Sequence, residues 1–228
     1  MKKLLFLMLL LAACRPDPGE PDYGDQDQWI DAGDDDDDDT PDPDNLPGIV
    51  PFEAGDQRLS LGTFYEGPCS VCVEIDEVTN HFYIYQNEFT GGVTFQASPS
   101  DDRVEGYASD ELQHNGEGWM GGGIHWDEPI FLSDWDVLRV ALKSEVAAFE
   151  NATIGMNGGG TEVSVTVSDY GFVADGQWQG LEIPLADIAA GGADLSAVEV
   201  AMVLIVQGGE SGDVLLIDDL YLTQLADE

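Results

Sequence analysis

Two adjacent carboxylates, Asp218 and Asp219, interrupt the last hydrophobic run of the chain, "GDVLLIDDLYL" (residues 212–222). A β-strand sends successive side chains to opposite faces, so one of the two should point toward the interior if this run is a strand. A buried carboxylate is costly unless it is neutralised or finds a cation. Cations are scarce, because 7 Lys and Arg oppose 46 Asp and Glu, a formal charge of −39. Such a surface suits divalent cations and neutral ligands and repels nucleic acid.

A row of aromatic residues is the second feature that could do chemistry. In "HFYIYQ" (residues 81–86), Phe82 and Ile84 fit a core face, which leaves His81, Tyr83 and Tyr85 on the opposite face, about 6.6 Å apart along the strand. Polar-tipped aromatic rings can stack on a sugar and hydrogen-bond its hydroxyl groups. The glycine-flanked Trp119 and the nearby Trp126 are further candidates for ligand contact. The alternative is that these rings cover a sheet beneath a loop or belong to the core.

Catalytic patterns have little support. "VEIDEV" (residues 73–78) resembles the E-x-D-x-(x)-E strand of one jelly-roll glycoside hydrolase family, and Glu74 and Asp76 share a face. The next position on that face is Val78, while Glu77 points the other way, so the third carboxylate is missing. No G-x-S-x-G or H-E-x-x-H motif occurs, and three scattered histidines give zinc chemistry little support. We expect no enzyme, with a weak polysaccharide hydrolase as the remaining alternative.

The elements that position these residues are predicted to be strands throughout. From Gly48 onward, short runs with period-two alternation are divided by Gly, Asp, Asn and Pro clusters. In "VLRVALKS" (residues 137–144), Leu138, Val140 and Leu142 alternate with polar positions, and "EVSVTVS" (residues 162–168) behaves likewise. The apolar run 198–206 predicts a central strand, and "PLADIAAGG" (residues 184–192) is the best helix candidate. The pattern predicts an all-β, two-sheet antiparallel sandwich over residues 48–228.

Several segments in the second half resemble a known family. "WMGGGIHWDEPIFLSDWDVLRVALKS", "DGQWQGLEIPLADI", "DLSAVEVAMVLIV" and "SGDVLLIDDLYLT" follow the order of galactose-binding-like jelly rolls found among carbohydrate-binding modules. The resemblance covers about residues 119–223. It implies a jelly-roll fold, with Trp135 and Trp178 in the core, and fold alone is weak evidence of ligand.

The same resemblance implies a structural calcium at the edge of the sandwich. The first aspartate of the family's final "IDD" commonly binds this ion, and the match falls on Asp218, so Asp219 is expected to face outward. A glutamate of the first strand often assists; Glu66 in "TFYEG" is the candidate, with Glu53 in "PFEAG" as the alternative. The competing interpretation is a solvated carboxylate pair at a strand end.

The N-terminus has the pattern of an export signal. Lys2 and Lys3 precede an apolar run too short to span a bilayer, and the run ends in "LAAC", which resembles the lipobox of bacterial lipoproteins. Residues 1–13 are therefore predicted to be a signal peptide, with Cys14 as the lipidated residue; an ordinary secretory signal is the alternative. Arg15, in place of an aspartate that often favours inner-membrane retention, favours the outer membrane. Residues 14–47, rich in Pro, Gly and Asp, are predicted to be a disordered acidic linker.

The other two cysteines, Cys69 and Cys72, form a C-x-x-C pair. Redox pairs of this spacing open a helix, whereas here Gly67 and Pro68 precede the pair and a strand-like run follows. A local disulfide is therefore expected in an exported protein, with a reduced or zinc-bound pair as the alternative.

Together these patterns predict a lipid-anchored, non-catalytic carbohydrate-binding module of the cell envelope, stabilised by calcium. The expected partners are a polysaccharide or glycan and, through the lipid, the membrane; nucleic acid is not expected. The alternative is a structural or adhesive envelope lipoprotein whose sandwich contacts other envelope proteins.

Overall fold

The structure of the chain is a computed structural model, which describes residues 41, 45–48, 56–61, 72–73 and 80–226. All of these residues belong to one compact unit that spans residues 39–228. Its strands are β1 (Gln57–Ser60), β2 (Cys72–Val73), β3 (Asn80–Ile84), β4 (Phe95–Ser100), β5 (Ser109–His114), β6 (Trp119–Ile130), β7 (Val137–Lys143), β8 (Thr153–Gly158), β9 (Thr161–Thr166), β10 (Gln179–Pro184), β11 (Val198–Gln207) and β12 (Val214–Gln224). The helix α1 spans Leu185–Ala190, and two 3₁₀ turns span Ala147–Asn151 and Val167–Tyr170.

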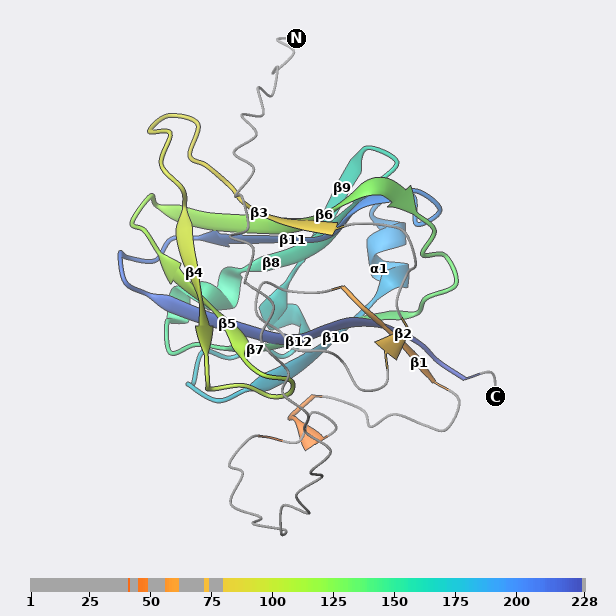
Figure 1. The fold of residues 1–228 in the computed structure, drawn as a ribbon, viewed down its shortest axis with the longest axis horizontal. Helices are drawn as coiled ribbons and strands as arrows, with labels where there is room; N and C mark the ends of the chain where they lie inside the picture. Colours follow the sequence, from red (N-terminus) through yellow and green to blue (C-terminus); the bar gives the residue numbers. More distant parts are fainter. Residues whose placement is uncertain (1–40, 42–44, 49–55, 62–71, 74–79, 227–228) are drawn as a thin grey trace, which may run out of the picture. The chain divides into compact units, whose positions relative to one another are not determined.

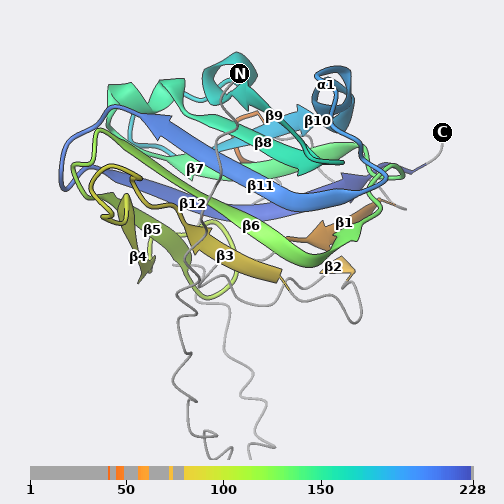
Figure 2. The same cartoon turned by 90° about the horizontal axis from the view of Figure 1, so that it is seen from above.

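The strands form two sheets that face each other (Figure 1). Sheet A has the order β10-β7-β12, and the far edge of β12 pairs with β5 over one half and with β1 over the other; β4 and β2 complete the sheet. Sheet B has the order β3-β6-β11-β8-β9, and its strands lie side by side in Figure 2. Every described strand pair is antiparallel except β1 with β2. The predicted two-sheet sandwich is confirmed, and the apolar run predicted to be central is β11.

Alternation builds the core between the sheets. Leu138, Val140 and Leu142 of β7 are buried, and Val163 and Val165 of β9 pack against the same core cluster. The predicted helix in "PLADIAAGG" is α1, whose Leu185 and Ile188 are buried. Each fully buried side chain of this size stabilises the fold by roughly 1.5–3 kcal/mol. Among the residues described, no helix has the length and apolar character needed to cross a membrane.

The apolar and aromatic residues of "VEGYAS" (residues 104–109) predict a strand, and this prediction is wrong. Strand β5 begins only at Ser109, and residues 104–107 form a bend before it. The cause is a long-range contact: the backbone N–H groups of Val104 and Glu105 donate to the carboxylate of Asp218 instead of to a neighbouring strand. The run "LSLGTFY" (residues 59–65) predicts a strand that begins at Leu59, whereas β1 begins two residues earlier and spans Gln57–Ser60.

A short N-terminal stretch also packs on sheet A. Leu46 is buried with Ala141, Trp178 and Leu216 in a second apolar cluster. Gly180 N–H donates to the carbonyl of Pro47 at 3.1 Å. The expected sites at Cys14, Glu53, Glu66 and Cys69 lie outside the described residues, as do residues 74–79 of the hydrolase-like strand; Cys72 is described only as part of β2.

Candidate functional site

The outer face of sheet B, turned away from sheet A, carries the aromatic row. In β6 the even-numbered residues Met120 and Ile124 point into the core, so Trp119, Gly121, Gly123 and His125 line the other side. Strand β3 pairs with β6 so that His81 lies opposite His125 and Tyr83 opposite Gly123. Tyr85 continues this register, because its N–H donates to the carbonyl of Gly121. We call the surface formed by His81, Tyr83, Tyr85, Trp119 and His125 the aromatic face.

Four rings of the aromatic face, those of His81, Tyr83, Tyr85 and His125, contact one another. Tyr83 meets His125 edge to face, with ring centroids 4.8 Å apart. The hydroxyl of Tyr85 lies 3.2 Å from Nε2 of the same histidine. At the rim, Nε2 of His81 is 3.0 Å from Oδ1 of Asp127. His125 is therefore the hub of the cluster, with a tyrosine on either side.

Electrostatics keep the centre of the aromatic face uncharged. Partial burial, helped by the nearby His81, lowers the pKa of His125, so the imidazole is neutral at neutral pH. Burial, together with the charge of Glu162, raises the pKa of Tyr85 to about 12, so its hydroxyl stays protonated. Two neutral groups, each able to donate or accept a hydrogen bond, thus share the middle of the surface.

Glycines form the floor beneath two of the rings. A Cβ at Gly121 would come within 2.7 Å of the Trp119 ring and of Cδ1 of Ile205. A Cβ at Gly123 would overlap the hydroxyl of Tyr85 and lie 2.8 Å from the carbonyl oxygen of Met202. Glycine in a strand interior often marks such a close approach. The "GGG" of residues 121–123 was the sequence signal for this floor, and the sequence-based prediction missed it.

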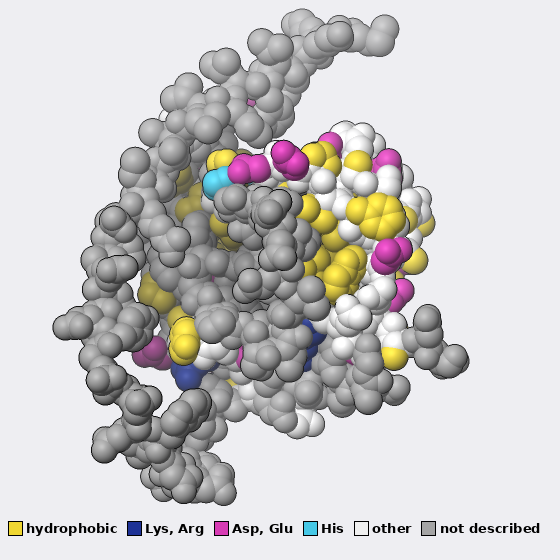
Figure 3. Space-filling view, turned by 45° about the vertical axis from the view of Figure 1, so that its right-hand side comes forward, with side chains coloured by type: hydrophobic (Ala, Val, Ile, Leu, Met, Phe, Trp, Pro, Cys, Tyr) yellow, Lys and Arg dark blue, Asp and Glu magenta, His cyan; other side chains and the backbone are white. Residues whose placement is uncertain are grey.

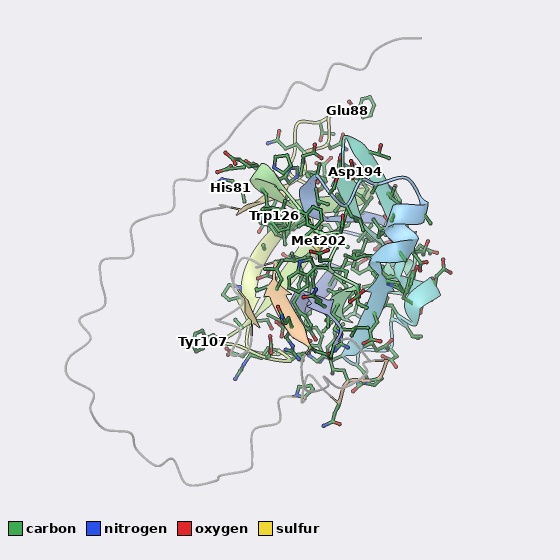
Figure 4. All side chains as sticks on the ribbon, turned by 90° about the vertical axis from the view of Figure 1, so that its right-hand side faces the viewer. His81, Glu88, Tyr107, Trp126, Asp194 and Met202 are labelled. Atoms are coloured by element: carbon green, nitrogen blue, oxygen red, sulfur yellow. The ribbon has the colours of Figure 1, made fainter. Side chains whose placement is uncertain are left out.

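Of the five residues predicted to contact a ligand, four lie on the outer face of sheet B and one lies in the core. His81, Tyr83, Tyr85 and Trp119 lie on the outer face of sheet B, as alternation predicts. Trp126 does not: it is 9% exposed and packs in the core, because it shares the inward parity of Met120 (Figure 4). His125 was missed, although its odd-numbered position in the same strand as Trp119 predicts the outer face.

Charge is distributed unevenly over the two sheets. The Lys and Arg residues that the structure describes are Arg58, Arg103, Arg139 and Lys143, and all four lie on sheet A strands or on the β4–β5 loop. Sheet B carries acidic neighbours instead, among them Asp127 and Glu162. In Figure 3 a histidine at the upper edge lies beside acidic side chains, while the Lys and Arg atoms in view lie low on the same face.

The carboxylate pair of β12 lies in sheet A, and both side chains are buried, Asp218 at 0% and Asp219 at 1% exposure. The expectation that Asp219 faces outward is wrong. The register of β12 against β7 is interrupted between Asp218 and Tyr221, and Asp219 adopts a left-handed backbone with φ 51°. A bulge of this kind breaks the alternation of side chains. Ile217 and Leu220 on either side of the pair both belong to the core between the sheets, so both carboxylates lie on the opposite face of sheet A, where residues 104–105 cover Asp218.

Each aspartate has a different partner. Oδ2 of Asp218 accepts hydrogen bonds from Val104 N–H at 2.6 Å and Glu105 N–H at 3.2 Å. Oδ1 of Asp219 lies 4.0 Å from Nη1 of Arg58, which is also 3.6 Å from Oε2 of Glu105. The guanidinium in turn stacks 4.4 Å above the ring of Tyr221. The guanidinium of Arg58 therefore partly compensates the negative charge of the buried pair.

This cluster of Arg58, Glu105, Asp218 and Asp219 holds more negative than positive charge. Burial raises the pKa of Asp218 to about 6, against the lowering effect of its backbone hydrogen bonds. Burial and the charge of Glu105 raise the pKa of Asp219 further above its usual range. Among the residues described, Oδ1 of Asp218 and both carboxylate oxygens of Asp219 find no hydrogen-bond partner. Protons or a further cation must balance the charge.

Calcium would match these oxygens in kind, because it takes carboxylate ligands. The residues described, however, contain no group of three or more His, Cys, Asp or Glu placed to hold a metal ion. The expected assisting residues, Glu66 and Glu53, lie outside the described residues. The described part of the chain thus offers oxygens of the right type but not a full ligand set.

Comparison with models of protein families finds no match. Comparison with curated proteins finds none either. Solved structures do match. One is described as a family 30 carbohydrate-binding module, at 15% identity and a TM-score of 0.49, with 73% of this chain and 98% of that chain covered.

Two other similar structures come from named bacteria. A family 11 carbohydrate-binding module of a cellulosomal cellulase of Clostridium thermocellum is 15% identical, with a TM-score of 0.42 and coverage of 75% of this chain and 95% of that one. An extra C-terminal domain of an exo-1,3/1,4-β-glucanase from a Pseudoalteromonas species is 13% identical, with a TM-score of 0.47 and coverage of 68% and 90%.

Proposed function

We propose that this chain is a non-catalytic module that binds a neutral polysaccharide on the aromatic face of sheet B. The observation that carries the proposal is the set of rings on this face. His81, Tyr83 and Tyr85 lie around a neutral His125, and Trp119 lies farther along the same face of β6. Tyr83 is 39% exposed, which leaves ring surface available to a ligand. Such rings offer an apolar face to a sugar ring and polar tips to its hydroxyl groups.

The geometry favours binding with little rearrangement. His125 is held between Tyr83 and Tyr85, His81 is hydrogen-bonded to Asp127, and the glycine floor fixes how closely Trp119 and Tyr85 approach the sheet. Side chains that are already ordered lose less conformational entropy when a ligand arrives. A rigid row of rings along a strand therefore suits an extended sugar chain.

The charge pattern selects the class of polysaccharide. No described Lys or Arg lies on sheet B, and Asp127 and Glu162 border the aromatic face. A polyuronate or sulfated polymer would be repelled here, whereas a neutral polymer meets no such repulsion.

The experiment is affinity electrophoresis of the full chain in gels that contain neutral polysaccharides or a polyuronate. Retardation by at least one neutral polymer, weakened by Tyr83→Ala and absent with the polyuronate, is expected. Capture of envelope proteins without retardation by any polysaccharide would favour the adhesive lipoprotein instead. Release of reducing sugar from the panel would identify a hydrolase.

The proposal includes a lipid anchor at Cys14, which the "LAAC" sequence supports. More than one acyl chain makes such anchoring stable, at about 0.8 kcal/mol per buried CH₂. Cys14→Ser should move the protein from the membrane fraction to the soluble fraction of the bacterial envelope. Unchanged membrane partition in this variant would rule out lipidation at Cys14.

We also propose that calcium binds the buried carboxylates of β12, with Asp218 as a ligand and Glu66 as the expected assisting residue. The support is the presence of three carboxylate oxygens that find no hydrogen-bond partner in the described part of the chain, within a cluster of net negative charge. Bound calcium would supply positive charge that the described residues of this cluster provide only through Arg58.

Calcium at a hundredfold excess over Kd should stabilise the fold by about 2.7 kcal/mol. For a domain of this size, each kcal/mol raises Tm by roughly 2–4 °C. Asp218→Ala should abolish this response. Magnesium at equal ionic strength is the control, because any cation screens so acidic a chain. Equal stabilisation by both ions would refute a calcium site.

A further inference from the structure

The loop between β3 and β4 presents the most exposed large hydrophobic side chain among the residues described. Phe89 is 89% exposed, and the bridge between Gln86 and Val93 closes the loop at its base. A single exposed aromatic residue needs no functional explanation by itself. The hydrogen bonds that hold this loop in place, however, suggest a functional role for Phe89.

Hydrogen bonds fix the loop on both sides of Phe89. The side-chain oxygen of Asn87 accepts from the N–H of Phe89 at 3.0 Å, and the hydroxyl of Thr90 accepts from Gly92 N–H at 3.1 Å. Both side chains are tied to a single carboxylate, because Oε2 of Glu117 accepts from Nδ2 of Asn87 at 3.1 Å and from the Thr90 hydroxyl at 2.7 Å. The loop is therefore fastened to the turn between β5 and β6.

The fastened loop stands at one end of the aromatic face. Asn87 of the loop comes two residues after Tyr85, and its partner Glu117 comes two residues before Trp119. The bond between Asn87 and Glu117 therefore places the loop at the end of the aromatic face where Tyr85 and Trp119 lie. Figure 1 shows the loop rising above sheet B on the side away from sheet A. In Figure 4, Glu88 lies beyond His81 and Asp194 in that direction.

We propose that Phe89 is a specificity-determining residue that contacts the ligand at the Tyr85–Trp119 end of the aromatic face. This inference rests on the proposed function and adds a raised contact to a surface otherwise built on the sheet. The occupant is a neutral polysaccharide chain long enough to pass from His81 to the loop. Two carboxylates, Glu88 and Glu117, flank Phe89, so an anionic chain would be repelled at this end as well.

Rigidity is what makes the exposed ring useful. A phenyl group on a mobile loop would lose conformational freedom when it contacts a sugar, and that loss would offset much of the gain. Here the bonds to Glu117 order the loop before the ligand arrives. An aromatic contact of this kind corresponds to about a threefold to tenfold change in Kd.

The test compares Phe89→Ala with Tyr107→Ala in the full chain. Tyr107 is also an exposed aromatic residue, at 74%, but it lies on the β4–β5 loop of sheet A. The probe is whichever neutral polysaccharide retards the wild type, together with a disaccharide cut from it. Phe89→Ala should weaken binding of the polymer by about threefold to tenfold and leave the disaccharide unaffected, while Tyr107→Ala changes neither.

A second variant tests the bracing. Thr90→Val removes the hydroxyl bond to Glu117 and keeps the ring, so it should also weaken polymer binding, with an unchanged Tm for the domain. If the wild type binds and Phe89→Ala binds equally well, the inference is wrong and the proposed function stands. If equal losses occur for polymer and disaccharide, Phe89 does not act at a chain end, which also overturns the inference. If the wild type binds no neutral polysaccharide, the proposed function fails and this inference fails with it.

Discussion

The aromatic face of sheet B and the buried cluster of sheet A place polar side chains in opposite environments. Tyr83 is 39% exposed, while Asp218 and Asp219 are almost fully buried. Groups at the surface exchange water for a ligand with little effect on folding, whereas buried charges contribute to the free energy of unfolding whether or not a ligand is present. The first region should therefore control binding, and the second should control stability.

The largest effect is expected at Arg58. Arg58→Gln removes the guanidinium beside Asp219 and Glu105 and leaves buried carboxylates without their cation. Breaking a buried pair in this way costs about 3–5 kcal/mol, which would lower Tm by roughly 10 °C in thermal unfolding at pH 8. The control is Arg103→Gln, because that guanidinium contacts only backbone carbonyls of its own loop in the bonds described. Similar small losses for both variants would contradict the role of Arg58.

The next effect concerns pH. Because burial raises the pKa of Asp218 to about 6, and that of Asp219 further above its usual range, the folded state holds protons that the unfolded chain releases above about pH 4. Stability without calcium should therefore fall as pH rises, from about 4 to 6 through both aspartates and beyond pH 6 through Asp219 alone.

Asp219→Asn isolates the second part of this dependence. Asparagine tolerates the left-handed backbone at φ 51° and carries no titrating proton, so the decline above pH 6 should flatten. Urea unfolding as a function of pH measures the slope. Asp134→Asn, which removes an exposed charge, is the matched control. Equal slopes in the two variants would mean that the acidic surface, and not the buried pair, sets the pH dependence.

A moderate effect is expected where the aromatic face meets its floor. In Gly123→Ala the new methyl group overlaps the Tyr85 hydroxyl and crowds the carbonyl of Met202. Such overpacking costs about 1–3 kcal/mol and should displace the ring. Addition of Tyr85→Phe should recover part of the loss in thermal unfolding, because one of the two clashes is gone. A Gly123→Ala protein as stable as the wild type would show that the floor is loosely packed.

The smallest effect on stability is expected at the rim. His81→Gln removes an exposed partner of Asp127, so the free energy of unfolding should change by no more than about 0.5 kcal/mol. Binding of a neutral polysaccharide, measured by affinity electrophoresis, should nevertheless weaken. A clear loss of stability with unchanged binding would reverse the comparison between the two regions.

Local patterns decided much of the fold. Alternation in β3 placed Phe82 and Ile84 toward the core and His81 and Tyr83 outside, and the long apolar run correctly predicted the central strand β11. These features depend on residues that are neighbours in sequence, because the pleat of a strand has a fixed period of two. Sequence alone was therefore sufficient for the sandwich and for most of the aromatic face.

Only the tertiary structure decided the surroundings of the buried pair and of Phe89. The bulge in β12 placed Asp219 on the same face of sheet A as Asp218, and the cation beside it, Arg58, comes from the other end of the folded domain in sequence. Glu117 likewise braces a loop that lies some thirty residues before it. Strand pairing and register bring these groups together across long separations, and no local period encodes such encounters.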